Sequence, residues 1–311
     1  MWMNGFARWM DKLKVLSSEA GSKACWGYDA CPAGDGIIAS IDGYSMDSSR
    51  LPWMSLGDWG WKSVVAAASD VAASGGAPFH VMYSLGLDSV ERAVDVARGV
   101  GEAAVWMGAT VGKSDFNTSK SPWIDVAVLG KAEKPLGRFG AKPGMTLVQV
   151  GASGYGLLSH LTLQGRLSRD DLPGPVVEYT RRPKPPLRIG PELSSCEAAA
   201  SIDNSDGLGA SLHLLGVESG VSVVIDDILV DRHVEKVLDE LGLEKWAVLQ
   251  SWEDYNIVAV GGDGSIDCIL RWCRRLNIEC ATVGYTSSDG AGRVLIEGGR
   301  REFRVSGWTW L

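Results

Sequence analysis

Side chains of the kind that bind zinc are scarce in this sequence. Its 311 residues include four scattered histidines and six cysteines, and no two cysteines form a C-x-x-C pair. Structural zinc sites depend on closely spaced cysteine and histidine ligands, so we do not expect zinc. In the absence of such a motif we expect the cysteines to be reduced, buried thiols of a cytoplasmic protein.

A basic surface and a long apolar run are also missing. The formal net charge is −8, whereas binding to nucleic acid or an acidic membrane needs a basic face, so neither partner is expected. No run of about 18 apolar residues is present, and the N-terminus lacks a signal peptide's apolar core, so we expect no membrane segment. A nucleotide ligand is compatible with this charge, because carboxylates can hold divalent cations against a polyphosphate.

The common nucleotide-binding fingerprints are absent. The chain has no G-x-x-x-x-G-K-[ST] sequence, and the glycines at 151, 154 and 156 are better explained as a plain turn than as a dinucleotide loop. Four scattered histidines do not define a Ser-His-Asp set. Function must therefore be sought in other side chains.

The pattern of apolar residues predicts a mixed α+β fold of two domains. A basic stretch rich in proline and glycine, residues 131–144, indicates a linker or a long turn, and we place the domains at 1–136 and 137–311. Predicted strands cover 37–41, 81–87, 124–129, 146–150, 221–225 and 256–260, with a closing hairpin at 294–296 and 303–305. Predicted helices cover 61–73, 208–215 and 266–273, and a further helix starts with a capping box at Asp88 and Glu91.

Acidic residues stand at the ends of several apolar segments. They are Asp29, Asp42, Asp70, Asp203, Asp206, Glu253 and Asp254. Carboxylates near buried segments cost free energy unless they are paired or bound to metal, and Mg²⁺ prefers a few carboxylates together with phosphate oxygens. Five of these seven residues also have an ordinary interpretation: Asp206 as a helix cap, Asp42 and the 253–254 pair as turn residues, and Asp70 as a solvated helix residue. Spacing alone does not decide between these interpretations.

Taken in order, these segments resemble the thiamine-monophosphate kinase family, within the superfamily of aminoimidazole-ribonucleotide synthase and selenophosphate synthetase. The motifs that carry the resemblance lie between residues 27 and 308. They are Gly27-Tyr28-Asp29-Ala30, Ser40-Ile41-Asp42, Asp58 to Gly75 with Lys62 and Ser69-Asp70, Gly76 to Leu87, Asn204-Ser205-Asp206-Gly207-Leu208, Trp252-Glu253-Asp254-Tyr255, and Gly307-Trp308.

The resemblance implies a two-domain fold like that of aminoimidazole-ribonucleotide synthase, whose N-terminal domains pair into an intersubunit β-barrel in a homodimer. It implies ATP and Mg²⁺ as cofactors and phosphoryl transfer to thiamine monophosphate, giving thiamine diphosphate. It assigns catalysis to Ser205 and Asp206. The implied metal ligands are Asp29, Asp42, Asp70, Asp203 and Asp206. The implied cofactor contacts are Lys62, Ser69, Thr110 and Lys113, and the implied substrate contacts are Glu253, Asp254, Tyr255 and Trp308.

Three departures leave alternatives open. Tyr28 and Ala109 stand where the family has carboxylates, and Ala67 stands where it has asparagine. Asp115 is a candidate replacement for the carboxylate lost at 109. One alternative is a non-catalytic or altered-specificity nucleotide-binding paralogue, and another is an ATP-dependent synthase acting on a different phosphorylated acceptor.

Overall fold

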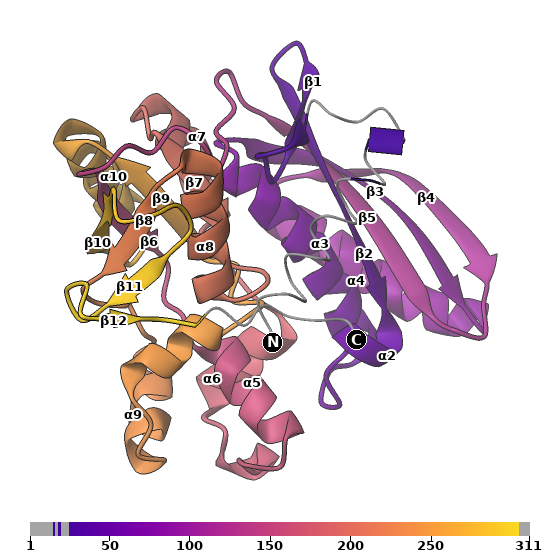
Figure 1. Ribbon diagram of the computed structural model, residues 1–311. Coiled ribbons are helices and arrows are strands. Elements are labelled where there is room, and N and C mark those ends of the chain that lie inside the picture. The colour runs from indigo at the N-terminus through magenta and orange to yellow at the C-terminus, as the bar shows by residue number, and fades with distance from the viewer. Residues whose placement is uncertain (1–14, 16–17, 20–24, 305–311) are drawn as a thin grey trace.

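Two β-sheets, one from each half of the chain, organise the molecule (Figure 1). The computed structural model describes residues 15, 18–19 and 25–304. Helices accompany both sheets, and parallel and antiparallel strand pairs both occur. The predicted mixed α+β class is confirmed.

The first sheet has five strands in the order β1-β2-β5-β3-β4. Their bounds are Cys31–Gly34 (β1), Ile37–Ser45 (β2), Ala77–Leu87 (β3), Thr110–Thr118 (β4) and Trp123–Lys131 (β5). A short helix, α2 (Met46–Ser49), follows β2. Two long helices, α3 (Leu56–Ala73) and α4 (Val90–Trp106), cover one face and lie against each other. Glycines allow this close approach, because a Cβ added at Gly99 would overlap the backbone of Gly57.

The second sheet has seven strands in the order β12-β11-β8-β10-β6-β9-β7. The strands are β6 (Thr146–Val150), β7 (Ala200–Asp203), β8 (Ser222–Ile225), β9 (Ile257–Gly261), β10 (Cys280–Ser287), β11 (Val294–Ile296) and β12 (Arg301–Glu302). The α-helices of this half are α5 (Tyr155–Leu163), α6 (Gly174–Arg181), α7 (Gly190–Ser195), α8 (Leu208–Ser219), α9 (Arg232–Glu240) and α10 (Asp263–Leu276). Short 3₁₀ turns occupy Arg169–Asp171, Leu187–Ile189 and Lys245–Gln250.

The two halves share an apolar core. One cluster joins α3, α4 and the first sheet to Val148, Val150 and Ile257 of the second sheet and to α10. A second cluster fills the space between the second sheet and helices that include α5, α8 and α9. Because α3 also packs against β7 and β9, it brings the acidic end of the first half against the second sheet.

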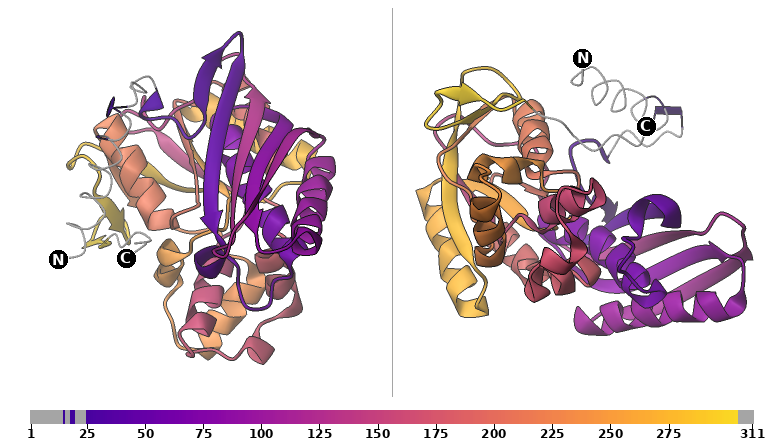
Figure 2. Two further views of the ribbon diagram at one scale, coloured as in Figure 1. Left: turned by 90° about the vertical axis from the view of Figure 1, so that its right-hand side faces the viewer. Right: turned by 90° about the horizontal axis from the view of Figure 1, so that it is seen from below.

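The other face of the first sheet carries no helix in the left view of Figure 2. Outward-pointing residues of adjacent strands form rows across it, and Ile41, Ala127 and Met82 make up one such row. Ile41 is 72% exposed, and every residue of β4 is exposed. An apolar residue this exposed on the face of a sheet marks a face able to pack against another surface.

The prediction of reduced cysteines is wrong in this structure. All six are joined in the pairs Cys25–Cys31, Cys196–Cys268 and Cys273–Cys280. Their Cα–Cα distances of 5.0, 5.6 and 6.2 Å lie in the range of disulfides. No C-x-x-C motif marks these pairs, because their cysteines are separated by 6, 72 and 7 positions, and only the fold brings them together.

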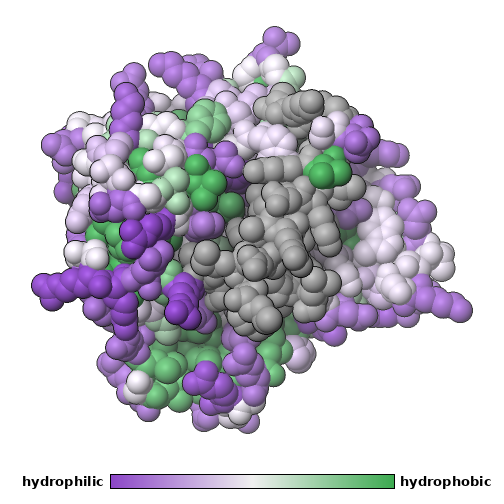
Figure 3. Space-filling model, viewed as in Figure 1, coloured by the Kyte–Doolittle hydropathy of each residue, from purple (hydrophilic) through white to green (hydrophobic). Residues whose placement is uncertain are grey.

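The surface seen in Figure 3 mixes hydrophilic side chains with small apolar patches. Within the described residues, no helix is long and apolar enough to cross a membrane.

Candidate active site

The five aspartates predicted as metal ligands gather where the two halves meet. Asp29 precedes β1, Asp42 lies in β2, Asp70 lies near the end of α3, Asp203 ends β7, and Asp206 precedes α8. The charges of Asp29 and Asp206 act on Asp42, and those of Asp29, Asp42 and Asp203 act on Asp70. Residues up to 177 positions apart in sequence therefore form one acidic cluster. We refer to these five residues as the acidic cluster.

Hydrogen bonds fix three members of the cluster, two of these bonds between the halves and one within the first half. Ser69 Oγ donates to Asp203 Oδ2 at 2.6 Å, and the Asp203 backbone N–H donates to Asp29 Oδ2 at 3.3 Å. Ser40 Oγ donates to Asp70 Oδ2 at 2.5 Å. Ser69 was predicted as a cofactor contact, but its side chain is fully buried and holds Asp203.

Loss of hydration raises the pKa of every carboxyl in the cluster. Burial, then the charges of Asp206 and Asp29, raise the pKa of Asp42 from 3.8 to about 7. Burial, then Glu253 and Asp29, raise the pKa of Asp206 to about 6. The pKa values of Asp70 and Asp203 lie well above the ordinary value for the same two reasons. Negative charge is therefore disfavoured here unless a cation compensates it.

One side-chain cation pairs directly with the cluster in the described chain. Arg138 Nη1 lies 2.8 Å from Asp29 Oδ1, yet burial still leaves the pKa of Asp29 raised. Charge and oxygen donors thus fit divalent cations such as Mg²⁺. Within the described residues, however, no three acidic, histidine or cysteine side chains already surround a single metal position. Mg²⁺ sites completed by phosphate oxygens and water need only one or two carboxylates each, so the two observations agree.

Lys62 and Glu253 form an ion pair that joins the halves beside the cluster. Lys62, in α3, is 1% exposed, and its Nζ lies 2.6 Å from Glu253 Oε1 and donates to Ser49 O at 2.6 Å. Glu253 adopts φ +55°, a backbone region that costs free energy for residues other than glycine. The charge of Glu253 contributes to the raised pKa of Asp206. Lys62 therefore holds Glu253 at the rim of the cluster. The predicted contact of Lys62 with the cofactor stays a prediction.

Asp254 and Tyr255 point into the protein. Asp254 is fully buried and accepts hydrogen bonds from the N–H groups of Gly154 at 2.7 Å and Gly156 at 2.9 Å. It thereby closes the glycine turn that begins α5. Tyr255 is also fully buried. As predicted substrate contacts these two residues remain untested, but in this structure they shape the loop that presents Glu253.

The residues predicted on β4 lie apart from the cluster within one chain. Thr110, Lys113 and Asp115 are exposed, and strand pairing places them on the open sheet face. Asp42 lies on the opposite, helix-covered face, three strands away, which corresponds to roughly 14 Å at the usual strand spacing. Asp115 therefore lies apart from Asp42 of its own subunit, and its replacement of the carboxylate lost at Ala109 stays a prediction. Trp308 lies outside the described residues.

Two polar residues that contact the cluster were absent from the predicted set, Arg138 and Ser40. Arg138 belongs to the basic stretch read as a linker, so its sequence signal was charge alone. Ser40 stands two residues before Asp42, and alternation along a strand would have placed both side chains on one face. Ser205, predicted as catalytic, donates from Oγ to Asp203 Oδ1 at 3.4 Å.

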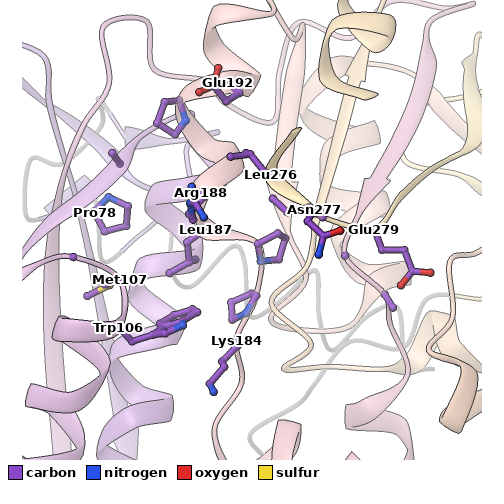
Figure 4. A pocket seen from close by; sticks show the side chains of 18 of the residues that line it. Pro78, Trp106, Met107, Lys184, Leu187, Arg188, Glu192, Leu276, Asn277 and Glu279 are labelled. Carbon is purple, nitrogen blue, oxygen red and sulfur yellow. The ribbon is translucent and has the colours of Figure 1, made fainter. Parts of the chain in front are cut away.

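A cavity of about 890 Å³ lies elsewhere between the halves (Figure 4). Its lining includes Trp106, Lys184, Leu187, Arg188 and Asn277. None of the site residues predicted from the sequence lines this cavity. Its charges are mixed, because Glu192 and Glu279 also line it, so it does not share the acidic character of the cluster.

The chain is similar in sequence to a known domain family and to several known proteins. Residues 23–132 match the model of the AIR synthase related protein, N-terminal domain. A thiamine-monophosphate kinase of Pyrobaculum calidifontis is 31% identical over 89% of this chain and 88% of its own length. Those of Archaeoglobus fulgidus and Nitrosopumilus maritimus are 30% and 25% identical over 63% and 91% of this chain, and 65% and 91% of their own lengths.

Solved structures show the same fold. AaThiL complexed with AMPPCP and TMP has a TM-score of 0.82 at 22% identity, with 96% of both chains covered. The thiamine monophosphate kinase from Aquifex aeolicus has a TM-score of 0.79 at 23% identity, covering 94% of this chain and 96% of that one.

Proposed function

Because the chain belongs to the thiamine-monophosphate kinase family, we propose that it transfers the γ-phosphoryl group of ATP to thiamine monophosphate, giving thiamine diphosphate. The observation that carries this proposal is the acidic cluster, whose raised pKa values call for cations. A relative's fold has been solved with AMPPCP and TMP, which supports a nucleotide and a thiamine phosphate as the pair of substrates.

Positioning and charge neutralisation account for most of the catalysis in phosphoryl transfer. Mg²⁺, when bound, would neutralise the polyphosphate and the group being transferred. The chain contributes the carboxylates that would hold it, among them Asp42 within β2 and Asp206 in the loop before α8, both of them partly exposed. We assign the catalytic role to Asp206, because it lies close enough to Glu253, a predicted substrate contact, for the charge of Glu253 to act on it.

Glu253 is the best placed of the predicted substrate contacts. Its side chain is 25% exposed while its charge faces Asp206 and pairs with Lys62. Held in this way, Glu253 can contact an acceptor beside the transferred phosphate without rearranging. We propose that Ser205 orients Asp203 through the hydrogen bond from its hydroxyl.

A non-catalytic, nucleotide-binding paralogue is the second candidate. Tyr28 packs edge to face on Phe139 at 5.0 Å between ring centres, and Ala109 is 8% exposed, so both positions of the missing carboxylates are taken by packing. Under the kinase proposal, the five remaining aspartates are enough for a smaller set of cations. An ATP-dependent synthase on another phosphorylated acceptor is kept as an outcome of the test below.

We further propose that the chain works as a homodimer joined through the open sheet face, in an intersubunit β-barrel. Ile41 and the rows of outward-pointing residues beside it would be buried there. Thr110 and Lys113 lie on the same face, so they would act at the interface and not in the cluster of their own chain. The domains at 1–136 and 137–311 belong to this proposal, because the division falls between β5 and β6.

Replacing Ile41 with lysine tests the dimer. A buried charge at the centre of the interface is expected to shift the protein to monomers, measured by light scattering during gel filtration. The matched change Val105→Lys, at an exposed position on α4, should leave the mass unchanged. Identical masses for the wild type and Ile41→Lys would refute this interface.

A cytoplasmic location is part of the proposal. Disulfides are rare in the cytosol of mesophiles, but they are common in intracellular proteins of hyperthermophiles. The three pairs are therefore compatible with an intracellular kinase.

Turnover is the test of the kinase proposal. The folded protein is incubated with ATP, Mg²⁺ and thiamine monophosphate, and thiamine diphosphate is followed by mass spectrometry. We expect product from the wild type and a loss of about 100-fold or more in Asp206→Asn. Nucleotide binding without product would favour the paralogue, and ADP formation only with a different phosphorylated acceptor would favour the synthase.

A further inference from the structure

One disulfide closes the loop that presents Asp29. Cys25 and Cys31 flank this loop, and their Cα atoms are 5.0 Å apart. Of the acidic cluster, Asp42, Asp70 and Asp203 sit within a strand or a helix. Asp29 lies in a loop, so the backbone ladder of a regular element does not fix it.

The far side of this loop is held by specific contacts. Arg138 donates to Asp29 through its guanidinium at 2.8 Å and to Gly27 O through its backbone N–H at 2.7 Å. The Ala30 N–H donates to Ser74 Oγ at 2.8 Å. Gly27 adopts φ +83°, and a Cβ added there would come within 2.7 Å of the ring of Phe139. The chain therefore turns tightly against its neighbours just before Asp29.

Like charges oppose this placement. The Asp29 carboxylate accepts a hydrogen bond from the backbone N–H of Asp203 at 3.3 Å, so it lies beside a second carboxylate that β7 and the hydroxyl of Ser69 hold in place. A loop with a free end would relieve the repulsion by moving outward. A covalent bond from Cys25 to Cys31 limits that movement, because the two ends of the loop cannot separate.

We propose that the Cys25–Cys31 disulfide positions Asp29 for divalent-cation binding, so that its reduction weakens the cation site of the proposed kinase. The cysteines are positioning residues, since they act through Asp29. The chemistry is thiol–disulfide exchange with a dithiol reductant. A thiolate of the reductant attacks one sulfur of the Cys25–Cys31 bond, which forms a mixed disulfide and releases the other cysteine as a thiolate. The second thiol of the reductant then attacks the reductant's own sulfur in the mixed disulfide and releases the remaining cysteine. The protein gains two thiols, the reductant becomes a disulfide, and two electrons are transferred.

A second disulfide in the same chain provides a matched control. Cys273 and Cys280 are 7 positions apart, against 6 for Cys25 and Cys31. The two loops are of similar length, so removal of either bond releases a similar constraint on the unfolded chain. Cys273–Cys280 joins the end of α10 to the start of β10 and holds no member of the acidic cluster.

The test measures Mn²⁺ affinity by electron paramagnetic resonance in the presence of a non-hydrolysable ATP analogue. The double variants Cys25→Ser/Cys31→Ser and Cys273→Ser/Cys280→Ser are compared with the wild type, and thermal unfolding is recorded for each. We expect the first variant to bind Mn²⁺ about 10-fold more weakly, as losses of supporting contacts around a metal typically do. The second should keep wild-type affinity while losing a similar amount of thermal stability.

Dithiothreitol provides a second test, in which the bond is broken in the folded wild type itself and the two double variants serve as references. It should weaken Mn²⁺ binding by the folded wild type and by Cys273→Ser/Cys280→Ser, and cause no further loss in Cys25→Ser/Cys31→Ser. Unchanged Mn²⁺ affinity after complete reduction, or equal losses in both double variants, would overturn the inference while leaving the kinase proposal intact. A wild type that binds neither Mn²⁺ nor the analogue would overturn both.

Discussion

At the scale of the residue, the ionised carboxylates of the acidic cluster lower the stability of the folded protein until a cation binds them. A carboxyl whose pKa is raised in the folded state is destabilised when it ionises, and Asp42 shows this with a pKa of about 7 against an ordinary 3.8. No feature of the fold requires five aspartates with raised pKa values around one another, whereas a site for cations and phosphate explains all of them. The sequence identified these five residues through a resemblance, because Asp206 alone was also explained as a helix cap, Asp42 as a turn residue and Asp70 as a solvated helix residue.

The first prediction concerns the pH dependence of Asp42. Because the folded state holds this proton more tightly than the unfolded chain, its contribution to stability is fully present below about pH 4 and is lost as the pH rises through about 7. In chelator, Asp42→Asn should therefore be more stable than the wild type at pH 8, by roughly 1–3 kcal/mol, and its unfolding free energy should change less with pH. Denaturant titrations between pH 4 and 8 measure both.

Mg²⁺ separates this effect from a general gain in stability. The cation should stabilise the wild type at pH 8 more than it stabilises Asp42→Asn. The control Asp263→Asn, at an exposed residue of α10, should follow the wild type throughout. A wild type that becomes more stable from pH 5 to 8 in chelator would contradict the assignment.

At the scale of the element, the glycine turn and α5 depend on one buried carboxylate. The sequence treated the glycines at 151–156 as a plain turn and Asp254 as a substrate contact, and the structure joins the two features through hydrogen bonds. Periodicity found most strands, with β6 predicted at its observed bounds, and the helices α3, α4, α8 and α10, but it missed α5, α6, α7 and α9. It missed β4, whose sequence TVGKSDFNT has no apolar alternation. It also placed the cap of α4 at Asp88, whereas Ser89 is the N-cap and Asp88 pairs with Arg92.

The second prediction follows from that carboxylate. Asp254→Ala removes the acceptor of two backbone N–H groups in a buried turn, and we expect it to lower the free energy of unfolding by about 2–4 kcal/mol. The control Asp239→Ala, at an exposed carboxylate of α9, should change stability by less than about 1 kcal/mol. Equal effects on stability from the two changes, measured in urea, would show that Asp254 does not anchor α5.

At the scale of the whole molecule, the disulfides tie distant segments together in ways that no local pattern reveals. Cys196 directly follows the last residue of α7, and Cys268 lies within α10, 72 positions later. Sequence reasoning assigned free thiols because it judged the cysteines by spacing alone. The overall α+β fold was predictable from the order of motifs, whereas the cysteine pairing and the distance of β4 from the cluster required coordinates.

The third prediction ranks these bonds. In the chain-entropy model, a loop of about 70 residues gives a stabilisation of about 4 kcal/mol and one of about 7 residues gives about 2 kcal/mol. Cys196→Ser/Cys268→Ser should therefore lower the midpoint of thermal unfolding more than Cys273→Ser/Cys280→Ser does. A wild type whose melting temperature is unaffected by complete reduction would contradict the contribution of all three bonds.

The account depends most on the claim that the acidic cluster holds divalent cations against the phosphates of ATP. A crystal structure with AMPPCP and Mn²⁺, recorded at a wavelength where manganese scatters anomalously, tests this most directly. We predict anomalous peaks within about 2.2 Å of carboxylate oxygens of the cluster, Asp42 and Asp206 among them, with phosphate oxygens completing each site. A nucleotide bound with its phosphates away from the cluster, and no anomalous peak beside these aspartates, would contradict the account.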